Sequence, residues 1–171
     1  MATATVDTTR KQGSSRTNAT LAGMPDWESV IHAVQVALSG DRSEGRGLLD
    51  ACWASTASGD HAKRCVIAHY LAAVQDDLED EIRWDESALT DYQSVGDGDL
   101  AAIGIPSAAG LAPSLHLNLG DGYLRRGDVS AARQELDAGL ASVGALGDDG
   151  YSAMIRKGLR GLEERLGKQG G

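Results

Sequence analysis

Apolar residues recur at helical spacing in seven segments of the chain, and short polar breaks separate these segments. The first segment carries its apolar residues at Trp27, Val30, Ile31, Val34 and Leu38. Asp26 suits the N-cap of this helix, and Gly40-Asp41 ends it. By the same signs, further helices are expected from about residue 43, after Asp60, over 78–92, 113–126 and 130–143, and after Asp148 or Asp149.

No stretch alternates apolar and polar residues as a half-buried strand would. We therefore expect an all-α fold in which about seven helices stack as antiparallel hairpins. The predicted helical domain covers residues 25–167. Residues 95–112, rich in Gly, are expected to form a long loop or a short irregular helix. Residues 1–24 have the composition of a disordered arm, and residues 168–171 that of a C-terminal tail.

One segment, residues 115–146, carries a repeat-like pattern of small and large apolar residues. Its marker positions are Leu119-Gly120, Tyr123, Gly127-Asp128, Ala132 and Leu136. In this pattern the segment resembles a tetratricopeptide repeat, although Gly139 stands where a second Ala is usual and Gly144 where Pro is common. Weaker matches extend over residues 26–92. The alternative is an unrelated helical bundle.

The resemblance implies a short right-handed superhelix, capped by the seventh helix, with a concave groove for a peptide or protein. By the same resemblance, the groove would be faced by Ser114, Leu117, Asp121, Leu124 and Arg125. Asn118 is the plausible counterpart of the residues that clamp a peptide carboxylate in co-chaperone members of the family. The Asn118 amide could equally form a hydrogen bond between two helices. Val30 and Val34 stand where that clamp needs Lys or Asn, so this specificity is not implied.

Charge is concentrated in residues 76–99, which hold ten Asp or Glu and a single Arg. The chain has 16 Lys and Arg against 25 Asp and Glu, a net charge of −9, which argues against nucleic-acid and anionic-membrane partners. Asp77, Asp80 and Glu81 would attract a basic partner, or would form a solvated helix face. Glu79 and Arg83 are expected to pair on the surface, as are Asp121 and Arg125.

His61, Cys65 and His69 recur every four residues and form one helical stripe. Neighbours on such a stripe can share a metal ion, but the two His lie about 12 Å apart along the helix, so a further ligand would be needed. The alternative is a packing stripe, and we expect no metal and no cofactor. The two Cys, without a framework spacing, are expected as free thiols in a reducing cytoplasm. Neither a secretory h-region nor a membrane-length apolar run is found in the sequence.

No catalytic motif is found, so the sequence predicts a protein that is not an enzyme. The favoured function is an interaction module that binds a protein or peptide, with Asn118, Asp121, Leu124, Arg125, Asp77, Asp80 and Glu81 as candidate binding residues. One alternative is a protein that binds a small molecule or metal in a gap left by residues 95–112. Another is a homodimer in which Arg156, Lys157 and Arg160 meet the acidic stretch of a second copy. The composition is typical of a high-GC bacterium.

Overall fold

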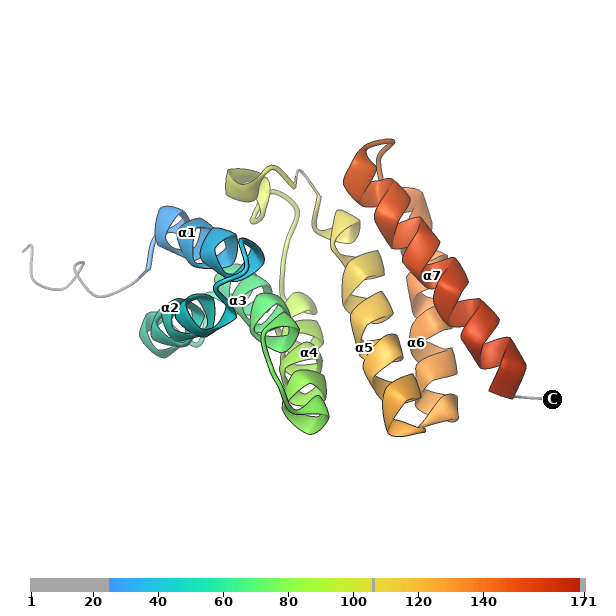
Figure 1. The fold of residues 1–171 in the computed structure, drawn as a ribbon. Helices are drawn as coiled ribbons and strands as arrows, with labels where there is room; N and C mark the ends of the chain where they lie inside the picture. Colours follow the sequence, from blue (N-terminus) through green and yellow to red (C-terminus); the bar gives the residue numbers. More distant parts are fainter. Residues whose placement is uncertain (1–24, 106, 170–171) are drawn as a thin grey trace, which may run out of the picture.

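The computed structural model describes residues 25–105 and 107–169, and within these ranges the chain is entirely helical apart from turns and loops (Figure 1). The predictions for residues 1–24, 170 and 171 lie outside the described residues. The α-helices are α1 (Trp27–Leu38), α2 (Arg42–Ser55), α3 (His61–Ala73), α4 (Leu78–Tyr92), α5 (Ala112–Arg126), α6 (Val129–Ser142) and α7 (Gly150–Gln169). Three short 3-10 helices are η1 (Ala101–Ile103), η2 (Ala108–Gly110) and η3 (Val143–Ala145).

Aspartate side chains start six of the seven α-helices. Each accepts a hydrogen bond from a backbone N–H in the first turn, where the helix has no partner of its own for that group. The six are Asp26, Asp41, Asp60, Asp77, Asp128 and Asp149. Asp149, rather than Asp148, caps α7, because its Oδ1 lies 2.7 Å from the backbone N of Ser152. The helix starts predicted at Asp26 and Asp60 are confirmed.

The neighbouring helices pack as pairs, α1 with α2, α3 with α4 and α5 with α6, while α7 lies against both α5 and α6. The predicted all-α class with seven helices is confirmed within the described ranges. Figure 1 shows α1–α4 as one group and α5–α7 side by side as another, with the segment that follows α4 running between them. The right-handed superhelical shape stays a prediction. The predicted tail is shorter than expected, because α7 continues through Lys168 and Gln169 past the buried Leu166.

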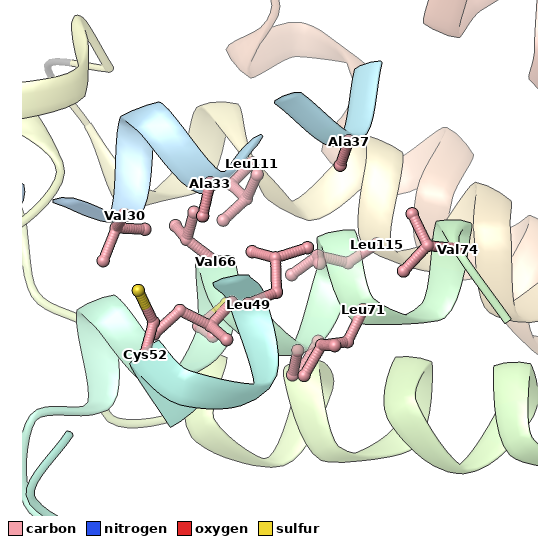
Figure 2. Close-up of a cluster of buried hydrophobic side chains, with 14 of the residues drawn as sticks. Val30, Ala33, Ala37, Leu49, Cys52, Val66, Leu71, Val74, Leu111 and Leu115 are labelled. Atoms are coloured by element: carbon pink, nitrogen blue, oxygen red, sulfur yellow. The ribbon is translucent and has the colours of Figure 1, made fainter. Parts of the chain in front are cut away.

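Two clusters of buried apolar side chains hold the fold together. The N-terminal core gathers side chains of α1–α4, with Leu100, Leu111 and Leu115 (Figure 2). The C-terminal core is formed by α5–α7 and consists mainly of leucines. Glycines let helices approach closely in both: a Cβ on Gly45 would clash with the backbone of Ala37, and one on Gly158 would lie 2.5 Å from Leu117 Cδ2.

Leu38, one of the apolar positions of the first predicted helix, is exposed, and so is Met154 near the start of α7. The side chain of Leu38, in the last turn of α1, is 67% exposed, and that of Met154 is 58% exposed. Met154 precedes the buried Ile155 by one residue, which turns its side chain by about 100° around the helix. The apolar face of α7 is therefore narrower than its sequence indicates.

Candidate functional site

A cavity of about 380 Å³ lies where α1, α3, the segment between α4 and α5, and the start of α7 meet. Its apolar wall is formed by Val30, Val34, Val66, Ile103, Ile105 and Leu111, together with Ile31. Its polar residues are Gln35, His69, Tyr70, Asp149 and Tyr151. These segments are far apart in the sequence, so the cavity exists only in the folded chain.

The segment between α4 and α5 supplies one wall of the cavity because it folds back onto the core. Leu100 and Leu111 are buried and anchor the part of this segment that lines the cavity. Between them, η1 ends at Gly104, whose φ of 82° favours glycine, and the backbone N of Ile105 donates to the Leu100 carbonyl at 3.2 Å. The loop or irregular helix predicted over 95–112 is thus a pair of short 3-10 turns that present Ile103 and Ile105 to the cavity.

His69 and Asp85 form an unusual buried pair beside this cavity. Their side chains are 10% and 1% exposed, and His69 Nδ1 lies 3.9 Å from Asp85 Oδ1, too far for a hydrogen bond. Within the described residues, His69 Nδ1 and both Asp85 carboxyl oxygens are enclosed without a hydrogen-bond partner. Leaving such groups unpaired costs about 1–3 kcal/mol each. Native proteins rarely keep them without a reason.

Burial sets the charge of both groups in this pair. Burial lowers the pKa of His69 to about 4, so its ring is neutral at neutral pH. Burial, and then the negative charge of Glu81, raise the pKa of Asp85 well above its ordinary value. The other ring nitrogen, His69 Nε2, is not among the enclosed atoms that lack a partner, and His69 lines the cavity. We infer that Nε2 is the ring atom that faces the cavity.

Two tyrosines and an aspartate line another part of the cavity. Tyr70 and Tyr151 both line the cavity, and burial, followed by the influence of the Tyr151 phenol, raises the pKa of Tyr70. The Tyr151 side chain is partly exposed. The hydrogen bonds from Ser152 lower the pKa of Asp149, which keeps its carboxylate ionised at neutral pH.

Five of the predicted binding residues lie in two neighbouring hollows on α4, α5 and α7. Glu81, Asn118 and Asp121 line one of about 400 Å³, and Leu124 and Arg125 line another of about 430 Å³. Their charges pair with one another. Arg125 bonds to Glu81, and its Nε lies 2.9 Å from Asp121 Oδ2, which confirms the predicted pairing within α5.

Two predictions in this region, for Leu124 and for the pair of Glu79 with Arg83, differ from the structure. Leu124, expected to face a groove, is only 6% exposed and packs in the C-terminal core. Asp77 accepts hydrogen bonds from the first-turn backbone N–H groups of α4 and is exposed, so its attraction of a basic partner stays a prediction. Arg83 pairs with Asp80, so the predicted pair with Glu79 is wrong.

His61, Cys65 and His69 lie on one helix, but each side chain has different neighbours in the structure. His61 Nδ1 lies 2.8 Å from Asp91 Oδ1, while burial raises the pKa of the fully buried Cys65 to about 12. His69 faces Asp85. In residues 25–105 and 107–169, no three His, Cys, Asp or Glu side chains are arranged to hold a metal ion.

Sequence reasoning missed Asp85 because it counted this residue with the acidic stretch. The signal that could have found it is its position on α4, since Ile82, Asp85 and Leu89 follow the spacing of an apolar face. Asp85 and Asp91 are both buried, so the solvated helix face considered for residues 76–99 does not include them. Asp149 was expected only as a helix start, and nothing in the local sequence joined it to Tyr70.

Comparison of the chain with known protein families, with curated proteins and with solved structures finds no match. In the part of the chain that the structure describes, no helix combines the length and apolar character needed to cross a membrane. The candidate site is therefore described by its own geometry.

Proposed function

We propose that this protein binds a small, mainly apolar ligand in the cavity between α1, α3 and the segment that joins α4 to α5. The observation that carries this proposal is a cavity with a largely apolar wall, built from segments far apart in the sequence, that includes the buried and neutral His69. A volume of about 380 Å³ is within the range of small-molecule sites, roughly 300–1,000 Å³. Apolar walls favour a ligand whose carbon surface leaves water.

The proposal is for binding rather than catalysis. A carboxylate that assists a catalytic histidine orients the ring through a hydrogen bond. His69 Nδ1 and Asp85 Oδ1 are 3.9 Å apart and share no such bond. The pair therefore gives no support to proton transfer by His69.

Titration with the uncharged fluorophore N-phenylnaphthylamine tests this function. We expect saturable fluorescence enhancement with a single site in the unchanged protein. Val34→Phe should abolish it, because the larger side chain fills the cavity that Val34 lines. Val36→Phe, on the same helix but outside the cavity wall, should bind as the unchanged protein does. Circular dichroism checks that both variants fold.

Two results would overturn the proposal. One is fluorescence that rises without saturation, which indicates adsorption to exposed apolar surface. The other is saturable binding that a folded Val34→Phe variant leaves unchanged. Ile31→Phe serves as a second filling variant if Val34→Phe fails to fold, because Ile31 lines the same cavity.

A second candidate function is peptide binding in the hollow lined by Glu81, Asn118 and Asp121. It is favoured by Asn118, a partly exposed amide on the wall of that hollow. Selection from a displayed peptide library tests it. Peptides bound at this hollow should lose about tenfold in affinity, or about 1.4 kcal/mol, on Asn118→Ala. They should keep it on Gln134→Ala, an exposed amide of α6. Failure to enrich any peptide would contradict this candidate.

A further inference from the structure

The charge of the cavity wall indicates which ligands it accepts. Among the described residues that line the cavity, Asp149 is the one with an ionised side chain at neutral pH. His69 is neutral there because burial lowers its pKa to about 4. The remaining lining residues are uncharged. Among the described residues, the cavity wall thus carries a single negative charge, at the exposed Asp149.

Aromatic rings accompany this charge. Tyr70 and Tyr151 both line the cavity, and their phenols lie close enough to influence each other. The face of a phenol ring attracts a cation, and an alkylated ammonium group benefits most because little water has to be removed from it. A carboxylate that shares the cavity wall with two tyrosines is suited to such a group.

One positive group, Arg156, lies near Asp149, and hydrogen bonds hold its guanidinium at two backbone carbonyls. Arg156 is close enough to lower the pKa of Asp149, yet its guanidinium donates to the carbonyl oxygens of Leu146 and Gly147 at 3.0 and 2.8 Å. The N-terminus of α7 carries partial positive charge, which Asp149 itself offsets as the cap. The net charge of −9 adds a field that attracts cations and repels anions.

We propose that the ligand is an organic cation with an apolar body, whose ammonium group lies at Asp149, Tyr70 and Tyr151 while its carbon chain fills the apolar end of the cavity. This inference rests on the proposed function and specifies the ligand class for the same site. A ligand with a carboxylate or phosphate head would meet the like charge of Asp149. An uncharged ligand would gain nothing from it.

Three compounds with one carbon chain and different heads separate the possibilities. Isothermal titration calorimetry with octyltrimethylammonium, octanol and octanoate compares cationic, neutral and anionic heads directly. We expect the cation to bind about tenfold more tightly than octanol, and octanoate more weakly than both. Raising the salt from about 50 to about 500 mM should reduce the preference for the cation and leave octanol unaffected.

Two neighbouring aspartates provide a matched pair of variants. Asp149→Asn keeps the helix cap, because Asn caps as well as Asp, and removes the charge. It should bring the affinities for octyltrimethylammonium and octanol within about threefold of each other, or about 0.65 kcal/mol. Asp148→Asn removes an adjacent charge that does not line the cavity, and should keep the tenfold preference. Tyr151→Leu should reduce this preference several-fold.

The possible outcomes show separately whether the cationic ligand class is wrong and whether the cavity fails to bind any ligand. If octanol or octanoate binds as tightly as the cation, and Val34→Phe blocks them all, the cavity is a binding site and the cationic class is wrong. If Asp149→Asn and Asp148→Asn reduce the preference equally, general surface charge explains it and the site at Asp149 is wrong. If none of the three compounds binds saturably, the proposed function fails together with this inference.

Discussion

The two cores of the molecule are built differently. The C-terminal core is mostly leucine, with Leu124, Leu136, Leu159, Leu162 and Leu166 all buried. The N-terminal core is bordered by aromatic side chains, among them Trp53 and Trp84, whose ring centroids are 4.9 Å apart. Beside it lie the buried His69, Asp85 and Asp91. The buried members of the C-terminal core are all aliphatic.

This difference indicates where function is located. Uncompensated buried polar groups lower stability, and proteins tend to tolerate them where they serve a site. His69 and Asp85 lie on α3 and α4, and His69 lines the cavity. In the C-terminal half, His116 Nδ1 lies 2.8 Å from Glu135 Oε2, so the histidine there has a partner. His116 therefore has a carboxylate partner for its Nδ1, whereas the Nδ1 of His69 has none among the described residues.

The largest effect is expected at the contact between α1 and α2. Gly45→Ala places a Cβ against the backbone of Ala37, which cannot move away without separating the helices. We expect the free energy of unfolding to fall by about 3 kcal/mol. Gly47→Ala, on the exposed face of the same helix, should raise it by about 0.5–1 kcal/mol. Urea unfolding followed by circular dichroism measures both, and equal effects would refute the close contact.

A pH-dependent effect is expected from Asp85→Asn. Well below the ordinary pKa of 3.8, the carboxyl is protonated in both the folded and unfolded chains, so the variant should match the unchanged protein. As the pH rises, the unfolded carboxyl ionises in water while burial holds the folded one protonated, which destabilises the unchanged protein. Asp85→Asn should therefore gain about 1–3 kcal/mol by pH 8.

The control for this prediction lies in the other half of the molecule. Asp137→Asn changes an exposed carboxyl of α6, and its unfolding free energy should follow the unchanged protein at every pH. Urea unfolding at several pH values measures both variants. A constant difference for Asp85→Asn would mean that its carboxyl is ionised in the folded protein.

A smaller packing effect is expected in the C-terminal half. A Cβ on Gly158 would meet the end of the Leu117 side chain, which can rotate away. Gly158→Ala should therefore cost only about 1 kcal/mol, less than Gly45→Ala. Gly161→Ala has open space around it and should be neutral or stabilising. Thermal unfolding compares the two, and a larger loss at Gly158 than at Gly45 would reverse the order of rigidity proposed for these contacts.

The smallest effect is expected from the ion pair that joins α4 to α5. Glu81 and Arg125 are partly exposed, and such pairs contribute about 0.2–1 kcal/mol. A double-mutant cycle with Glu81→Gln and Arg125→Gln should give a coupling energy in that range, reduced at about 1 M salt. A coupling that salt does not change would point to a hydrogen bond rather than a charge interaction.

The helices were predictable because their signals are local. Asp26 and Asp60 stand directly before apolar-periodic segments, and Gly127 ends α5 with a positive φ that suits glycine. The cavity was anticipated only as a gap near residues 95–112. Its wall joins His69 to Tyr151 across 82 positions of sequence, which no local pattern encodes. Asp85 was hidden among ten acids whose burial depends on which face of α4 meets its neighbours.

The aspartate caps have a consequence for how this sequence could change. Six aspartates start six helices, yet Asn serves as an N-cap equally well. Replacing all six would keep the helix starts and make the chain six charges less negative. Its acidity is therefore separable from its architecture. Related sequences could therefore differ in surface charge, and in the ions and molecules that this charge attracts, while their helices begin at the same positions.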